Sequence, residues 1–297
     1  MKFSRKLLLM FSVLVAVGLY GCSSSSHSFS QSQSPSSLSS NQSSSTVFES
    51  KPTASVQSQD DLAQLPFDVS KYPENYAIIN NNVPVFENDF KQTVTAAQKA
   101  KTTRAQTYFA GLDDLGRTQS VSAIVTYGMM HSHSSAVRKR PSFPKTTKVS
   151  GEYADGVYNK NLQMWFGKQS NNRIVQLNGY RGYLYNKSHL LAWSLGGDMQ
   201  THNVILGTRA QNVGTNNQKT PGGMAYTETL TRSYLTAHQD DAVAYQVIPV
   251  YVGSELVARG THVLVQSINN PDQFHYNVWV FNNQPGARID YNTGSFN

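Results

Sequence analysis

Residues 185–212 constrain the fold of this chain more than any other segment. The segment begins with a short strand-like run that ends at His189, and Gly196 and Gly197 then predict a turn. The apolar run 204–206 predicts a second strand, and the polar residues up to Asn212 predict a helix. A strand, a turn, a strand and a helix can hold one imidazole and one amide oxygen face to face. We therefore expect His189 and Asn212 to belong to one site.

The rest of the pattern predicts an α+β fold with a central, mainly antiparallel sheet and flanking helices. Turns that follow one another with few crossover helices favour this arrangement. We expect one domain from 61 to 297, with helices at 88–100, where Asn88 or Asp89 is the expected N-cap, and at 224–237. Strands are expected at 83–86 (an edge strand because of Pro84), 121–127 (half-buried), 172–183 (a strand and turn), 245–251, 262–268 and 274–281.

The first 22 residues are typical of an export signal. Lys2, Arg5 and Lys6 precede an apolar run that is too short and too abruptly ended for a membrane-spanning helix. A small residue before Cys22 resembles the lipobox of bacterial lipoproteins, in which the cysteine is lipidated. Lipidation would anchor the protein on the extracellular face of the cell membrane. Because Tyr20 is bulkier than that pattern usually has, cleavage upstream (secretion) and an uncleaved anchor are the alternatives.

Residues 23–60 are rich in Ser and Gln and almost lack aliphatic side chains. Such a segment cannot bury enough apolar surface to offset the entropy lost on ordering. We expect a disordered tether, with a glycosylated stalk as the alternative.

Charge and cysteine content narrow the possible partners and sources of stability. The formal net charge is +7, of which three positive charges lie in the export signal. A mildly basic chain favours nucleic acid or an anionic membrane as partner, although an ordinary basic surface accounts for it equally well. With Cys22 as the single cysteine, an intrachain disulfide and a thiolate metal cluster are both excluded.

The residue types at the predicted site suit phosphodiester hydrolysis. This reaction needs a base for water and a cation that neutralises charge on the phosphate oxygens. The imidazole of His189 suits the first role, and Mg²⁺, which keeps most of its waters, needs little more than the amide oxygen of Asn212. By spacing alone, a structural histidine is the more common interpretation.

Three other groups are candidates. Glu228 and Arg232 are four residues apart on a predicted helix, so they share a face. They could be an acid near the metal and a base that binds phosphate, or a solvated surface ion pair. His131 and His133 form a possible metal pair, although such loop histidines are usually solvated. The basic run 138–140, with Lys145, fits either a phosphate backbone or a soluble loop.

Several stretches together resemble the DNA/RNA non-specific endonucleases, which belong to the ββα-metal or His-Me finger class. They are 186–191, 196–197, 203–212, 112–117, 222–228 and 289–294, in the family's order along the chain. Within the class, the chain is most similar to membrane-attached DNA-entry nucleases and secreted DNases of Gram-positive bacteria.

The resemblance implies a role for each matching residue. His189 is the expected general base, Asn212 the Mg²⁺ ligand, Glu228 the acid near the hydrated metal, and Arg232 a phosphate-binding residue. Asn203 is expected to support the site, and Lys187 and Arg209 to contact substrate. The family's Asp-Arg-Gly before the histidine reads Asn186-Lys187-Ser188 here, which removes an anionic orienter and the bidentate arginine fork.

We therefore expect an extracellular, metal-dependent non-specific endonuclease that cuts DNA and RNA and leaves 5′-phosphates. Mg²⁺ is the expected cofactor, with Mn²⁺ possible. A surface lipoprotein that binds DNA for uptake without cutting it is the first alternative, and a wall-associated adhesin is the second. An inhibitor protein would leave no signal in this sequence.

Overall fold

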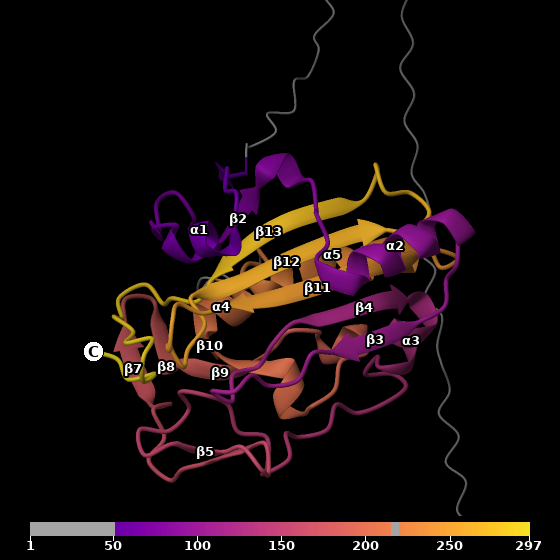
Figure 1. Cartoon of the computed structure of the whole chain (residues 1–297). Coiled ribbons are helices and arrows are strands. Elements are labelled where there is room, and N and C mark those ends of the chain that lie inside the picture. Colours follow the sequence, from indigo (N-terminus) through magenta and orange to yellow (C-terminus); the bar gives the residue numbers. More distant parts are fainter. Residues whose placement is uncertain (1–50, 215–219) are drawn as a thin grey trace, which may run out of the picture. The chain divides into compact units, whose positions relative to one another are not determined.

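Seven strands form one sheet in the order β1-β2-β13-β12-β11-β4-β3 (Figure 1). The computed structural model describes residues 51–214 and 220–297, so the export signal, Cys22 and residues 23–50 of the predicted tether lie outside the described part. The strands are β1 (Thr53–Ala54), β2 (Tyr76–Ile79), β3 (Gln106–Phe109), β4 (Val121–Thr126), β11 (Ala242–Val250), β12 (Gly260–Ser267) and β13 (His275–Phe281). β1 pairs parallel to β2 at one edge and all other neighbours are antiparallel, which confirms the predicted fold class.

Both faces of the sheet are covered. The helix α2 (Asn88–Ala100) lies against one face, where Val94 and Ala97 pack on Ile124 and Leu264 (Figure 1). The other face packs against α5 (Met224–Ala237) and against the segment that contains β9 and β10. Alternate residues of β11 therefore enter two different cores, which explains why the strand is apolar on both faces apart from Gln246.

Because both faces of the sheet are covered, the prediction of a half-buried strand at 121–127 is wrong. β4 is buried along Val121–Val125, and its one interior polar residue, Ser122, accepts a hydrogen bond from Gln246 Nε2 at 3.1 Å. The strand ends at Thr126, and α3 (Tyr127–Ser132) begins at once.

The predicted edge strand at 83–86 is wrong. The preceding 3₁₀ turn η1 (Asn80–Asn82) has three consecutive residues at positive φ (46°, 56° and 67°), which redirects the chain away from the sheet. Pro84 has no N–H for a ladder, and Phe86 instead packs beside α2. The helix bounds at 88–100 are correct, but Glu87 is the N-cap and its side chain makes no capping hydrogen bond.

The end of the predicted tether is folded. β1 pairs with β2, and α1 (Gln59–Gln64) starts with a capping box formed by Ser58 and Asp61. Leu62 is buried in a cluster with Trp279 and Phe281. Ala54 and Val56 pack against the same cluster, so backbone pairing, capping and a few apolar contacts together order this mostly polar stretch.

Smaller elements attach to the large sheet. There are two hairpins, β5 (Val157–Asn159) with β6 (Met164–Phe166) and β7 (Ile174–Leu177) with β8 (Tyr180–Tyr183). They are followed by the antiparallel pair β9 (Tyr185–His189) and β10 (Val204–Thr208). The short turns η2 (Trp193–Leu195) and η3 (Thr201–Asn203) join β9 to β10, and α4 (Arg209–Val213) follows β10. Among the described residues, no helix has both the length and the apolar character needed to cross a membrane.

Candidate active site

The strand–turn–strand–helix unit predicted at 185–212 is present. β9 and β10 pair antiparallel with His189 opposite Val204, and Tyr185 lies opposite Thr208. The Thr208 hydroxyl accepts a hydrogen bond from Gln211 N at 2.9 Å and so caps α4. The register places His189 at the end of one strand, and the cap starts the helix that carries Asn212.

Asn203 closes the long connection between the two strands. It is fully buried, its Oδ1 accepts from Leu191 N at 2.9 Å, and its Nδ2 donates to Leu191 O and Asp198 O, both at 3.0 Å. Gly197 lies so close that a Cβ there would meet Leu191 O at 1.8 Å. Because these bonds fix the loop beside His189, a structural role accounts for Asn203.

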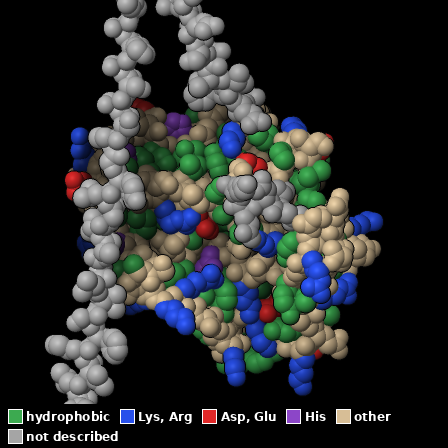
Figure 2. All heavy atoms as spheres, turned by 180° about the vertical axis from the view of Figure 1, so that it is seen from behind, with side chains coloured by type: hydrophobic (Ala, Val, Ile, Leu, Met, Phe, Trp, Pro, Cys, Tyr) green, Lys and Arg blue, Asp and Glu red, His purple; other side chains and the backbone are tan. Residues whose placement is uncertain are grey.

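One cavity of about 370 Å³ brings the predicted residues together. Its wall comes from β9, η2, α4, the first turns of α5 and the basic segment 138–148. The face in Figure 2 has Lys and Arg side chains gathered over its lower part, around an acidic and a histidine side chain near the centre. The lining residues are Arg140, Phe143, Asn186, Lys187, His189, Ala192, Trp193, Ser194, Asn212, Val213, Ala225 and Glu228.

His189 is held as a neutral imidazole. Only 8% of the residue is exposed, and the ring stacks on Phe143 with centroids 5.2 Å apart. Burial lowers the pKa of His189 to about 4, the charge of Arg140 acts in the same direction, and the backbone and carboxylate of Asp198 oppose the shift. Its Nε2 lies 3.3 Å from Met199 Sδ. The ring is therefore unprotonated at neutral pH and able to accept a proton.

The neighbourhood of Asn212 fits a hard divalent cation. Its Oδ1 accepts a hydrogen bond from Ser188 Oγ at 3.2 Å, and a carbonyl oxygen has a second lone pair for a metal. Glu228 supplies a carboxylate on the same cavity wall. The described residues contain no group of three or more His, Cys, Asp or Glu that could hold a metal. One amide oxygen with a nearby carboxylate suits an ion that keeps several waters, as Mg²⁺ does.

Glu228 and Arg232 lie on one face of α5, four residues apart, with Arg232 Nη1 3.9 Å from Glu228 Oε2. The Glu228 side chain is 16% exposed, and burial raises its pKa to about 7 against the charges of Arg232 and Arg140. Arg232 also donates to Ser194 Oγ at 2.9 Å and Thr229 Oγ1 at 2.8 Å. Arg232 therefore lies beside the cavity, anchored by the hydroxyl of a lining residue.

Lys187 and Arg209, the two other predicted substrate contacts, differ in their position relative to the cavity. Lys187 lines the cavity, but its Nζ forms an ion pair with Glu152 Oε1 at 3.1 Å, so its charge has a partner inside the protein. Arg209 does not line the cavity. Its backbone N–H donates to Leu184 O at 2.8 Å, and its charge acts on the phenol of Tyr180 in the β7–β8 hairpin.

Two lining residues were not singled out as site residues from the sequence. Phe143 stacks on His189, and Arg140 lies over the opposite part of the cavity with its guanidinium 5.7 Å from the Phe143 ring. The signal for Arg140 was the basic run 138–140. Nothing in the sequence marks Phe143, because its contact with His189 is made by a loop without periodic pattern.

His131 and His133, the possible metal pair, have separate partners in the fold. His131 packs against Tyr127 at a ring distance of 5.7 Å. His133 packs edge-on against Trp193 at 4.6 Å, and its Nδ1 lies 3.0 Å from Met129 O. These contacts fit the interpretation of ordinary structural histidines.

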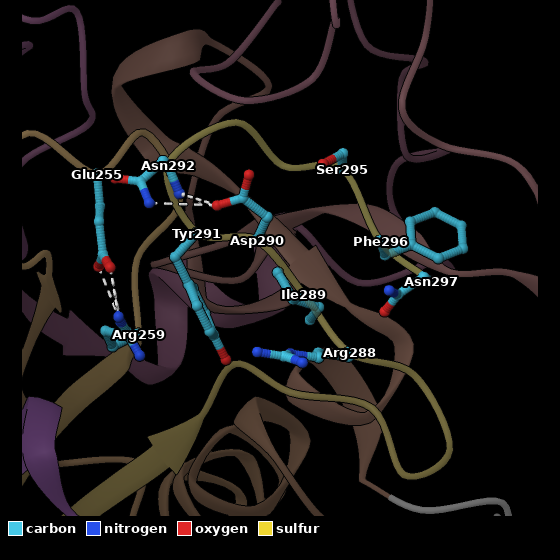
Figure 3. A pocket seen from close by; sticks show the side chains of 10 residues that line it. All are labelled: Glu255, Arg259, Arg288, Ile289, Asp290, Tyr291, Asn292, Ser295, Phe296 and Asn297. Carbon is cyan, nitrogen blue, oxygen red and sulfur yellow. Dashed lines mark hydrogen bonds and ion pairs between the residues drawn. The ribbon is translucent and has the colours of Figure 1, made fainter.

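A larger cavity of about 560 Å³ lies at the C-terminal turn (Figure 3). Its two carboxylates have partners within the protein. Glu255 pairs with Arg259, whose guanidinium stacks 4.3 Å from the Tyr291 ring centroid. Asp290 accepts hydrogen bonds from Asn292 N at 3.0 Å and Thr293 Oγ1 at 2.8 Å, within its own turn. None of the predicted site residues lines this cavity.

The chain matches known nucleases over the segment that carries the site. Residues 159–269 match the family model of the DNA/RNA non-specific endonucleases. A curated deoxyribonuclease of Streptococcus dysgalactiae subsp. equisimilis is 41% identical over 132 residues, which are 43% of this chain and 38% of that protein. The chain therefore spans well under half the length of this relative.

Two solved structures share the fold. The structure of Sda1 nuclease with a bound zinc ion is 27% identical with a TM-score of 0.63, over 78% of this chain and 99% of that one. NucA from Streptococcus agalactiae with a magnesium ion bound is 21% identical with a TM-score of 0.53, over 80% and 92% of the two chains. His189, Asn212, Glu228 and Arg232 all lie within the segment that matches the family model.

Proposed function

Because residues 159–269 match the family model of the DNA/RNA non-specific endonucleases, we propose that this protein is a metal-dependent endonuclease that hydrolyses phosphodiester bonds of DNA and RNA. One observation carries the proposal. The ββα unit brings a buried, neutral histidine and an amide oxygen into the same cavity, which Arg140 and the carboxylate of Glu228 also line. These are the groups that in-line attack of water on a phosphodiester requires.

In the proposed mechanism His189 is the general base. Since Nε2 lies at Met199 Sδ, in the loop, we assign proton acceptance to Nδ1. The ring takes a proton from water as the oxygen attacks phosphorus. The bond to the 3′ oxygen breaks, this oxygen takes a proton from a second water and leaves as a hydroxyl, and the other product keeps a 5′-phosphate. Burial under Phe143 keeps other water from the ring.

Asn212 would hold the cation, with Ser188 fixing the side-chain amide through the hydrogen bond to Oδ1. A bound divalent cation supplies positive charge against the charge that develops on the phosphate oxygens. We propose Mg²⁺, with Mn²⁺ as a substitute. Glu228 would orient the cation's water shell, and its carboxyl would ionise more readily once the charge of the cation adds to those of Arg232 and Arg140.

Two arginines suit the phosphate itself. Arg140 lines the cavity near both His189 and Glu228, and Arg232 lies beside it. Guanidinium groups offer several N–H donors in a fixed geometry, which suits phosphate oxygens. Contacts of this kind do not read base sequence, in keeping with cleavage at many sequences.

We also propose that the enzyme acts outside the cell, tethered to the membrane by lipid on Cys22 or secreted after cleavage of the export signal. The support is the charged start, apolar run and small residue before Cys22, followed by the Ser- and Gln-rich segment.

The test is cleavage of supercoiled plasmid and of an RNA by the purified chain. We expect nicked and then linear DNA, and shortened RNA, with Mg²⁺ present and none with excess EDTA. Retardation of DNA in a gel without nicking would instead support a non-cleaving DNA-binding protein. Neither nicking nor retardation at low salt, where phosphate contacts are strongest, would favour the adhesin.

A further inference from the structure

The β7–β8 hairpin has an outward face that nothing in the catalytic cavity explains. Ile174 pairs across the strands with Tyr183, and Gln176 pairs with Arg181, so these four side chains share one face. Ile174 and Tyr183 are 53% and 57% exposed, and Arg181 is exposed as well. The opposite face carries Val175 and Leu177, which pack on the core beneath β9 and β10. Since the inner face alone attaches the hairpin, the outer face does not serve stability.

This hairpin is connected to one element of the site, β9, and lies near a residue of another, α4. Its last residue, Tyr183, is two positions before β9, which carries Lys187 and His189. Tyr180 Oη donates to Tyr183 O at 2.6 Å, and the charge of Arg209 acts on the same phenol. Arg209 is three residues before Asn212 on α4, which places the two about one helical turn, roughly 5 Å, apart. Arg209 thus lies between the proposed cation site and the hairpin.

The charge of this region points to an anionic ligand. Between Asp155 and Asp198 the chain contains no Asp or Glu, whereas it contains Lys160, Lys168, Arg173, Arg181 and Lys187. Three of these charges have partners within the protein, because Lys187 pairs with Glu152, Lys160 pairs with Asp114 and Arg173 donates to Phe296 O. The charge of Arg181 is exposed beside an exposed aromatic ring, which is the combination that binds phosphates and stacked bases of single strands.

We propose that Arg181 and Tyr183 form a substrate subsite that holds a single nucleic-acid strand as it runs out of the catalytic cavity. The proposal rests on the proposed nuclease function. Arg181 contacts a phosphate, and a base stacks on the Tyr183 ring with Ile174 beside it. Arg209, which the sequence predicts as a substrate contact, acts on Tyr180 on the inner face with Leu177 and is not part of this subsite.

The test measures kcat and KM on a labelled single-stranded oligonucleotide with the full chain. Tyr183→Ala should raise KM at least about 5-fold, since a stacked base is lost, and should change kcat little. Tyr183→Phe keeps the ring and should restore the wild-type KM. Arg181→Ala should weaken binding and reduce the slope of log affinity against log salt by about 0.7, the value for one phosphate of a single strand.

Matched controls lie at the far edge of the large sheet. Tyr108 is 66% exposed on β3, and Arg104 is exposed just before it. Tyr108→Ala and Arg104→Ala should leave KM and the salt slope unchanged. Unchanged KM in Tyr183→Ala, with wild-type cleavage intact, would overturn the subsite alone and point to a protein ligand for this face. A wild-type chain that cuts no nucleic acid would remove the subsite together with the nuclease function.

Discussion

Two of the polar cavities in the described part of the chain, one at the C-terminal turn and one around His189, differ in what their charged groups are bonded to. The larger one, at the C-terminal turn, has its carboxylates engaged with Arg259 and with the backbone of their own turn. The smaller one contains a histidine whose pKa is lowered to about 4 and a carboxyl whose pKa is raised to about 7. Perturbed groups beside an available ligand atom, rather than volume, mark the place where chemistry is expected.

The largest expected effect on the cleavage rate is that of removing the proposed metal ligand, Asn212. Asn212→Ala removes the amide oxygen proposed to hold the cation, and we expect cleavage of plasmid DNA to fall at least ~10²-fold at saturating Mg²⁺. The matched change in the other cavity, Asn292→Ala, removes an exposed side chain bonded only within its turn and should leave the rate unchanged. Equal rates for both variants would contradict the assignment of Asn212.

Protonation of His189 should occur far below the usual range for imidazole. With a pKa of about 4 in the folded protein and about 6.5 when unfolded, the unfolded chain binds more protons between these values. Stability contributed by neutral His189 is therefore present above pH 6.5 and is lost as pH falls towards 4. NMR titration of the ring, assigned with a His189→Gln variant, should show it neutral at pH 5. Half-protonation near pH 6.5 would show that the ring is not desolvated.

Asn203 should matter for stability more than any polar residue of the C-terminal cavity. Asn203→Ala leaves the buried Leu191 N–H and two carbonyls without partners, and each such group costs about 1–3 kcal/mol. We expect the free energy of unfolding to fall by about 2–4 kcal/mol in urea titrations. Ser295→Ala, at an exposed position of the other cavity, should change it by less than about 0.5 kcal/mol.

A smaller difference, in KM for DNA, is expected between variants of one arginine from each cavity. Arg140→Ala should raise KM for DNA about 10-fold, because one charge-assisted contact to phosphate is lost. Arg288→Ala removes an exposed arginine that lines the C-terminal cavity and should have no effect. KM for both variants is measured by steady-state kinetics at fixed ionic strength. An equal rise in KM for both would mean that the charges act only through the general electrostatic field of the protein.

Local pattern accounts for the parts of the fold that could be predicted. The apolar alternation of β11, β12 and β13 and the strand–turn–strand–helix sequence at 185–212 specify their own geometry. The expected strand at 83–86 failed because three left-handed asparagines redirect the chain just before it. The half-buried character expected of β4 failed because its second face is covered by α2, which is distant in sequence.

The site shows the same division between local and long-range information. His189 and Asn212 come from one short unit, so a sequence pattern can place them together. The partner of Lys187 is Glu152, and the ring that covers His189 is Phe143, both on a loop without periodicity. Such contacts depend on tertiary packing, and only residue types, such as the basic run at Arg140, hint at them.

The role of His189 is tested most directly by single-turnover cleavage of supercoiled plasmid with excess enzyme and Mg²⁺. His189→Ala should be slower than wild type by about 10²–10⁴, the usual contribution of a general base. His131→Ala, at an exposed histidine that does not line the cavity, is the matched control and should cut at the wild-type rate. A folded His189→Ala protein that cuts as fast as wild type would contradict the account.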